Sequence, residues 1–163
     1  MIRPVSCADA EAVAAIYNHY IEHTTVTFEE QPVTIAAMAE RIDQSNADNL
    51  LWMVAEEQDE EVVGYAYTSK WQGRCAYRHS LEVTVYLSPN ATGKAWGTRL
   101  YEVLFEKLKQ GTTHALIAGI SLPNDASIAL HEKFGMTKAG HFNEVGFKFG
   151  QWVDVGYWQI TLT

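Results

Sequence analysis

The stretch from Leu81 to Leu108 reads LEVTVYLSPNATGKAWGTRLYEVLFEKL and predicts a strand, a turn and a helix in succession. From Leu81 to Leu87 apolar and polar side chains alternate, which is the period-two pattern of a strand with two different faces. This pattern places Glu82 on the face opposite the apolar row. After Gly97 the apolar residues recur at intervals of three and four, as on one face of a helix.

The turn between this strand and this helix predicts a site for an anion. Pro89 and Asn90 break the strand, and residues 92–97, TGKAWG, lead into the helix. The first backbone N–H groups of a helix lack internal partners and point outward beside the positive end of its dipole. We therefore expect residues 92–97 to hold an anionic group through their backbone.

Length and charge narrow the class of protein. The 163 residues suit one domain over residues 1–163, because about 70% of the unfolded surface is buried at this length. A formal charge of −8 argues against a nucleic-acid surface, which needs clustered Lys and Arg. No stretch approaches the ~18 apolar residues of a membrane span, and the N-terminus lacks an apolar signal core. Two cysteines give no disulfide framework and no zinc spacing. We expect a soluble, cytoplasmic protein without nucleic-acid or membrane partners.

The remaining segments predict an α+β fold. Helices are expected to begin after Ser6, Thr34 and Asn124, each of which can cap a helix N-terminus. Residues 24–32, TTVTFEEQP, have no helical or strand period and are interpreted as a shaped loop. Strand patterns occupy residues 2–5, 50–56, 61–71, 114–120, 138–149 and 152–162. Helices interleaved into a mostly antiparallel sheet are α+β rather than a strict βαβ succession.

The turn resembles the acetyl-CoA signature of the GNAT N-acetyltransferases, which reads Gln or Arg, two residues, Gly, one residue, then Gly or Ala. Here Thr92 replaces the Gln or Arg and Ala95 replaces the first Gly, whereas Gly97 matches. The Ala95 methyl group stands where the backbone should lie closest to a pyrophosphate. Longer stretches resemble the phosphinothricin acetyltransferase branch along nearly the whole chain: TVYLSP, GTRLY, SLPNDASIALHEKFGM, GFKFGQWVDVGYWQ and NHYIEHTTVTFEEQP.

This resemblance implies a GNAT-like fold, a mixed and mostly antiparallel central sheet flanked by helices. It implies acetyl-CoA as co-substrate, no metal, and a homodimer. Main-chain groups of Val85, Tyr86 and Leu87 would hold the pantetheine arm. The other positions that the resemblance assigns to CoA are Thr92, Gly93, Lys94, Ala95, Trp96, Gly97, Asn124 and Ser127.

Acetyl transfer to an amine needs a base for the ammonium proton, polarisation of the thioester carbonyl and a proton for the departing thiolate. Glu82 matches the family's glutamate, and we expect partial burial to raise its pKa and help it act as the base. The alternative is a solvated carboxylate. His131 stands where many GNAT enzymes carry a Tyr and is the candidate acid; the alternative is a histidine that only packs.

The acceptor implied by the resemblance is the α-amine of a small amino acid such as phosphinothricin (glufosinate), methionine sulfoximine or methionine sulfone. The guanidinium group of Arg binds a carboxylate or phosphinate through two hydrogen bonds and suits this role better than Lys. Arg74 and Arg78 precede the strand that carries Glu82. The candidate substrate residues are Phe28, Arg74, Tyr77, Arg78 and Lys148. A non-catalytic acyl-CoA sensor, or a GNAT enzyme for another small amine, stays open.

Two other motifs carry less weight. His19 to His23 spell H-x-x-E-H, a zinc metalloprotease pattern, but three fixed positions match easily by chance. The same segment resembles the acetyltransferases, so we expect no zinc. Gly93 and Lys94 are followed by Ala95 rather than by Ser or Thr, which excludes a nucleotide P-loop.

Overall fold

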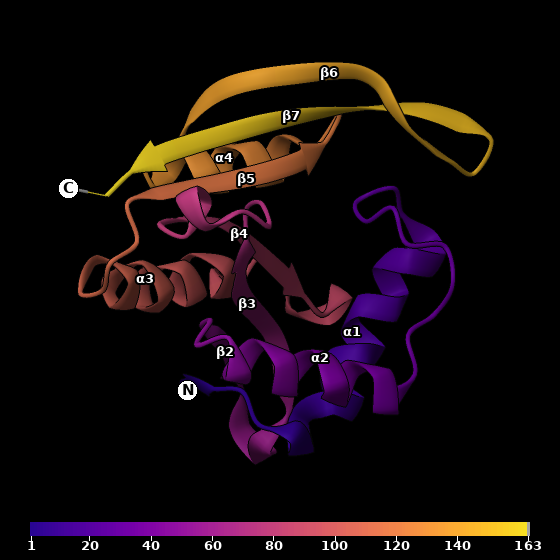
Figure 1. The fold of residues 1–163 in the computed structure, drawn as a ribbon. Coiled ribbons are helices and arrows are strands. Elements are labelled where there is room, and N and C mark those ends of the chain that lie inside the picture. Colours follow the sequence, from indigo (N-terminus) through magenta and orange to yellow (C-terminus); the bar gives the residue numbers. More distant parts are fainter. Residues whose placement is uncertain (163) are drawn as a thin grey trace.

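The computed structural model describes residues 1–162 and contains one seven-stranded sheet with the strand order β1-β2-β3-β4-β5-β7-β6 (Figure 1). The strands are β1 Ile2–Pro4, β2 Trp52–Glu56, β3 Val62–Lys70, β4 Ser80–Leu87, β5 Ala115–Ser121, β6 Thr137–Lys148 and β7 Gln151–Thr161. The helices are α1 Ala10–His23, α2 Ile35–Ala47, α3 Trp96–Lys109 and α4 Asp125–Lys133. Only the β4–β5 pair is parallel among these strands, so the predicted α+β fold with a mostly antiparallel sheet is confirmed.

Local signals place the helices as predicted. Ser6 and Asp9 form a capping box ahead of α1, and the Thr34 hydroxyl accepts a hydrogen bond from the Ala37 N–H at 3.1 Å. The Asn124 side chain likewise accepts from the Ser127 N–H at 3.1 Å. Gly135 follows α4 at φ 86°, a left-handed conformation that glycine adopts without strain. Among residues 1–162, no helix has the length and apolar character needed to cross a membrane.

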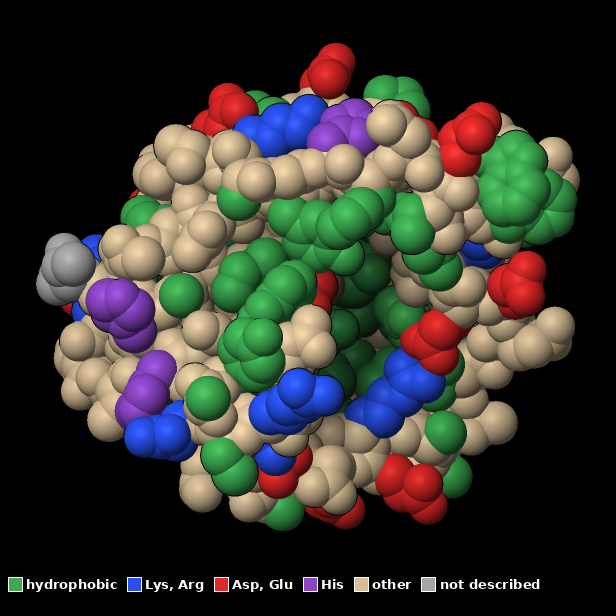
Figure 2. All heavy atoms as spheres, turned by 45° about the horizontal axis from the view of Figure 1, so that its top comes forward, with side chains coloured by type: hydrophobic (Ala, Val, Ile, Leu, Met, Phe, Trp, Pro, Cys, Tyr) green, Lys and Arg blue, Asp and Glu red, His purple; other side chains and the backbone are tan. Residues whose placement is uncertain are grey.

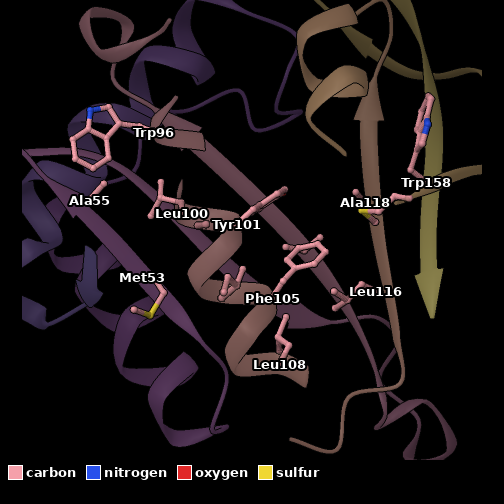
Figure 3. Packing of buried hydrophobic residues seen from close by; sticks show 14 of the residues in the cluster. Met53, Ala55, Trp96, Leu100, Tyr101, Phe105, Leu108, Leu116, Ala118 and Trp158 are labelled. Atoms are coloured by element: carbon pink, nitrogen blue, oxygen red, sulfur yellow. The ribbon is translucent and has the colours of Figure 1, made fainter. Parts of the chain in front are cut away.

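The first face of the sheet is covered by α3. Leu100, Leu104 and Leu108 are buried against it, as the three- and four-residue spacing predicts. Tyr101 and Phe105 are also buried, and Figure 3 shows them on the side of α3 that faces the strands. This apolar stripe holds α3 against the sheet, and with it the turn that precedes the helix.

The second face is covered by α1 and α2, and here the strand pattern was misleading. Tyr86 belongs to the polar row of β4, yet it is only 8% exposed and packs against Tyr17 and Tyr65. Trp52 and Val54 of β2 join the same cluster. The face that carries Glu82 is therefore a second core rather than a solvated surface.

The β4 and β5 strands separate partway along their length. They pair only where Ser80–Glu82 run beside Ala115–Ile117, although β4 continues to Leu87 and β5 to Ser121. Beyond Glu82 the backbone of β4 has left the ladder on that side. An open strand edge presents unpaired N–H and C=O groups. The separation thus leaves a cavity between the two strands.

Candidate active site

A cavity lies where β4 and β5 separate, closed on one side by α4. Five of the residues expected to meet the co-substrate or the reacting atoms line it: Val85, Tyr86, Asn124, Ser127 and His131. These residues come from two segments, β4 and the start of α4, that are far apart in the sequence. The fold therefore brings most of the predicted strand and helix positions together. Leu87 lies at the end of β4, where its carbonyl accepts a hydrogen bond from Tyr20 at 2.5 Å.

Glu82 reaches toward β5 at the point where the two strands part. The backbone N–H of Gly119 donates to its carboxylate, which by itself would lower the pKa. Desolvation is the larger influence, and the pKa of Glu82 is raised above its ordinary value. This is the direction expected for a base held in a partly dry site.

Gly119 leaves the space that the Glu82 carboxylate occupies. A Cβ atom at Gly119 would lie 3.4 Å from Glu82 Oε1 and 3.1 Å from Tyr157 Cε1. Gly119 is also exposed, whereas the four residues before it in β5 are buried. No motif in the sequence pointed to Gly119 as part of the site. An isolated glycine inside an apolar strand is a usable signal, because it often marks a close approach of backbone or ligand.

His131 is 4% exposed, and both of its ring nitrogens have partners. Nδ1 lies 2.7 Å from the Ser127 carbonyl oxygen, which can only accept, so Nδ1 carries the proton. Nε2 then accepts from the Tyr101 hydroxyl at 2.9 Å. Burial lowers the pKa of His131. The side chain is therefore a neutral imidazole with a fixed tautomer, and Tyr101 is a second residue that sequence reasoning missed.

The turn before α3 has the conformation of an anion site. Gly93 and Ala95 have positive φ angles of 78° and 60°, and Ala95, at the N-cap position, offers no capping side chain to the first N–H groups. Glu57 anchors the turn by accepting from Lys94 Nζ at 3.2 Å and from Trp96 Nε1 at 3.0 Å. The Trp96 side chain is buried in the core, so only its backbone can face a ligand.

Thr92 in this turn and Arg99 in the first turn of α3 are both exposed. Arg99 covers the Trp96 ring, with Cζ 4.0 Å from the ring centroid. The Thr92 hydroxyl donates to the Pro89 carbonyl at 3.2 Å, so Thr92 closes the turn locally. Gly97 lies in the first turn of α3, where an added Cβ would come within 3.3 Å of Leu130 on α4. Gly97 thus lets α3 and α4 approach each other.

The predicted substrate residues are dispersed. Arg74 and Arg78 are exposed, and Arg78 Nη1 donates to the Cys75 carbonyl at 3.1 Å within its own loop. Tyr77 lines a hollow beside Trp71 and Tyr157. Tyr77 is thus the member of this loop that faces a cavity.

Lys148 was expected to offer its ammonium group to the substrate, but the structure places it in the interior. It is 2% exposed, and Nζ donates to the Thr27 carbonyl at 2.8 Å. Phe28, 40% exposed, packs against Gly146 of the same strand β6. Lys148 and Phe28 therefore tie the loop of residues 24–32 to β6. Burial lowers the pKa of Lys148.

The H-x-x-E-H motif does not assemble a metal site. His19 and His23 lie on α1 with ring centroids 5.1 Å apart. Across the described range, residues 1–162, no group of three or more His, Cys, Asp or Glu side chains is placed to hold a metal ion.

The chain belongs to the GNAT acetyltransferase family, because the model of the acetyltransferase (GNAT) domain matches residues 2–156. The structure is similar to that of a GNAT superfamily phosphinothricin acetyltransferase from Sinorhizobium meliloti in complex with AcCoA. The TM-score is 0.96 at 33% identity, covering 99% of this chain and 88% of that one.

Curated relatives are similar over nearly the whole chain. Phosphinothricin N-acetyltransferase of Streptomyces viridochromogenes is 39% identical over 158 residues, which cover 97% of this chain and 85% of that protein. The L-methionine sulfoximine/L-methionine sulfone acetyltransferase of Pseudomonas paraeruginosa is 33% identical over 161 residues, 99% of this chain and 94% of that protein.

Proposed function

We propose that this enzyme transfers an acetyl group from acetyl-CoA to the α-amine of a small amino acid. The observation that carries the proposal is Glu82, a carboxylate with a raised pKa at the point where β4 and β5 separate. The names of the similar enzymes, which act on phosphinothricin or on methionine sulfoximine and sulfone, support the same class of acceptor.

The residues present fit acetyl-CoA, whose thioester supplies the acetyl group. The open edge of β4 at Val85 and Tyr86 offers backbone groups to an extended arm. The N-terminus of α3 offers outward N–H groups to a pyrophosphate. Asn124 and Ser127 lie beside the arm's expected path, at the start of α4. Backbone groups suit an acidic protein, because they hold an anion without a basic patch.

Glu82 accepts the proton of the substrate ammonium, directly or through a water molecule, and so frees the amine to attack. Its raised pKa makes it a better base than an ordinary carboxylate. His131 is proposed to supply the proton for the departing thiolate. The neutral ring is a far weaker acid than a thiol, so His131 acts as the acid only after it has gained a second proton from solvent. The imidazolium then gives one proton to the thiolate and returns to the neutral form. Tyr101 fixes this tautomer from the other side of the ring.

The acceptor's carboxylate is assigned to the loop before β4, where Arg74 and Arg78 supply exposed guanidinium groups and Tyr77 faces the hollow. Phe28 is proposed to form part of the wall of the acceptor site. Lys148 is withdrawn from this role, since its Nζ is bound to Thr27.

The enzyme is further proposed to work as a homodimer in the cytoplasm. The β6–β7 hairpin extends past the other strands in Figure 1 and exposes five large apolar side chains. These are Phe142, Val145, Phe147, Phe149 and Trp152, each 55–63% exposed. An apolar patch of this kind is typical of an interaction surface. Cys7 and Cys75 are free and exposed, as suits a reducing compartment.

Sedimentation tests the dimer. Trp152→Glu, which places a charge on the hairpin, should shift the protein from dimer to monomer. A wild-type protein that sediments as a monomer at micromolar concentration contradicts the dimer and leaves the transferase proposal intact.

A thiol-release assay tests the function. Acetyl-CoA is offered with phosphinothricin, methionine sulfoximine, methionine sulfone, ordinary amino acids, a polyamine and an aminoglycoside. We expect turnover with the first three compounds. Turnover confined to the polyamine or the aminoglycoside would refute the amino-acid assignment. Titration calorimetry with acetyl-CoA separates the sensor alternative, which predicts binding heat without turnover; no heat at millimolar ligand would remove the basis of the proposal.

A further inference from the structure

The cavity between β4 and β5 connects the two faces of the sheet. On the first face it is lined by His131 of α4, which packs against α3. On the second face it is lined by Val26, in the loop of residues 24–32 that follows α1. Glu82 also belongs to the second face, because its neighbour Val83 is buried in the cluster beneath α3. The proposed acid and the proposed base therefore lie on opposite faces of the sheet.

This arrangement gives the cavity a direction. His131 is proposed to serve the departing thiolate, and Glu82 is proposed to serve the attacking amine. An acyl group that passes from one to the other has to face the second side of the sheet, where Val26 lines the cavity. Figure 2 shows the surface hollowed beneath β6 and β7, with hydrophobic side chains inside, which gives an acceptor amine room to approach. Val26 therefore stands at the acyl end of the cavity.

The volume of the cavity matches a short acyl group. It measures about 50 Å³. A water molecule needs roughly 10–15 Å³ of such space, so the cavity holds about four atoms of that size. The end of an acetyl thioester has as many heavy atoms, namely the sulfur, the carbonyl carbon and oxygen, and the methyl carbon. A propionyl group adds another carbon, which fits only if a wall of the cavity moves.

The backbone on both sides of Val26 is fixed to α1. The Val26 N–H donates to Thr24 Oγ1 at 3.2 Å, and the Thr24 hydroxyl donates to the Tyr20 carbonyl at 2.7 Å. On the other side, Thr27 Oγ1 lies 2.9 Å from the Tyr17 hydroxyl, and both groups are buried. The position of the Val26 side chain therefore follows from that of α1.

The same loop is held from the opposite direction by β6. Lys148 Nζ donates to the Thr27 carbonyl at 2.8 Å, although Lys148 is only 2% exposed. The Phe28 ring occupies the space beside Gly146, where an added Cβ would overlap it. Figure 1 shows the segment between α1 and α2 beside the β6–β7 hairpin. Burying an ammonium group costs far more than burying an apolar side chain, so Lys148 indicates that this loop has to keep one position.

A third set of contacts fixes the loop to α2 and closes it. Arg41 of α2 donates to both carboxylate oxygens of Glu29, at 3.0 and 2.6 Å, which is the bidentate geometry of a strong pair. Asn18 of α1 accepts from the Val33 N–H at 2.7 Å and donates to the Val33 carbonyl at 2.9 Å. The loop is thus anchored to α1, α2 and β6, and it presents Val26 to the cavity.

We propose that Val26 closes the acyl end of the cavity and restricts the donor to acetyl-CoA, and that Lys148 and Phe28 are positioning residues that hold Val26 there. Val26 is 37% exposed, so a smaller side chain at this position enlarges the cavity without opening the core. This inference rests on the proposed function and adds to it the choice of acyl donor.

Donors of increasing length test the wall. Acetyl-CoA, propionyl-CoA and butyryl-CoA are compared by calorimetry and by thiol release with the fastest acceptor. We expect wild-type kcat/KM for acetyl-CoA to exceed that for propionyl-CoA by ~10-fold or more, the discrimination that one methylene supports. Val26→Ala should bring the two values close together. It should also tighten the binding of propionyl-CoA relative to acetyl-CoA by about 4-fold, the effect of one buried methylene. Val26→Thr keeps the branched shape and should restore the acetyl preference.

The outcomes separate this proposal from the proposed function. A wild-type enzyme that uses propionyl-CoA as well as acetyl-CoA would overturn the proposal, and so would a Val26→Ala enzyme with the wild-type ratio. Binding of acetyl-CoA without turnover on any amine would refute the proposed function instead, and the calorimetric ratio would still test the wall.

Two more variants test the residues that hold the loop. Lys148→Met removes the ammonium donor with a side chain of similar length, and Gly146→Ala displaces the Phe28 ring. Both should lower the acetyl-to-propionyl ratio, as Val26→Ala does. Gly140→Ala is the matched control in β6, because an added Cβ there meets nothing within 4 Å, and it should keep the ratio. If the first two variants melt lower but keep the wild-type ratio, Lys148 and Phe28 only stabilise the fold, and their positioning role is overturned.

Discussion

Ala95→Gly should make the protein more stable, although glycine usually weakens a folded chain. Ala95 has φ 60° and ψ 18°, the left-handed conformation. For a residue with a Cβ this conformation costs roughly 1–2 kcal/mol relative to the right-handed one. Glycine removes that strain but adds roughly 0.5–1 kcal/mol of unfolded-state entropy. The net gain is about 0.5–1 kcal/mol, which corresponds to ~1–4 °C in the melting temperature of a chain of this size.

Two control variants isolate the backbone conformation as the cause. Ala15→Gly lies in the exposed interior of α1, where glycine brings only the entropic loss and should lower stability by about 1 kcal/mol. Gly93→Ala, at φ 78° with open space around an added Cβ, should destabilise through strain rather than through a clash. Ala95→Gly should therefore differ in sign from both controls, although all three variants exchange the same two residue types.

Thermal unfolding with and without acetyl-CoA is the assay. Ala95→Gly should keep or improve the affinity for acetyl-CoA, since it removes a methyl group from the surface that is proposed to face the pyrophosphate. A melting temperature lowered as much as in Ala15→Gly would refute the conformational argument. A large loss of acetyl-CoA affinity would mean that this turn is not the pyrophosphate site.

Three further variants address the chemistry. Glu82→Gln should lower kcat by ~10²–10⁴-fold with little change in acetyl-CoA affinity, and an unchanged rate at pH 7 would exclude Glu82 as the base. Because the folded-state pKa of Glu82 is raised, its charge destabilises the fold at pH 7, so Glu82→Gln should also melt higher there and lose this advantage below the ordinary pKa of 4.5. His131→Phe should lower kcat; normal turnover would return His131 to a packing role. Arg78→Ala should raise KM for the amino acid while sparing kcat, and an unchanged KM would remove Arg78 from the carboxylate site.

The elements were predictable because their signals are local. The alternation in β4, the leucine spacing in α3 and the caps at Thr34 and Asn124 each depend on residues within a few positions of one another. The turn before α3 was located by the same means. The sequence did not show why glycine would suit position 95, because the positive φ angle of Ala95 depends on the folded conformation of the whole turn.

The shape of the site depended on contacts that no local pattern encodes. The burial of Tyr86 depends on helices that cover its face of the sheet, and the alternation in β4 says nothing of them. Lys148 looked like a free cation because Thr27, its partner, lies 121 residues away in the chain. Gly119 approaches Glu82 only because β4 and β5 pair for three residues and then separate. Each of these features depends on contacts between residues that are far apart in the sequence.

Burial acts in opposite directions on the two proposed catalytic groups, and this fixes the pH dependence of the reaction. Desolvation disfavours the charged form of each, so it raises the pKa of Glu82 and lowers that of His131. As the pH falls, Glu82 gains a proton and loses its capacity as a base, so kcat/KM should decline on the acid side. An imidazolium at His131 is lost as the pH rises, and because burial lowers its pKa this loss begins below the ordinary value of 6.5. If the imidazolium supplies the proton of the thiolate, the rate should therefore also decline on the alkaline side. A profile that rises to a plateau through pH 8 would exclude the His131 imidazolium as the acid.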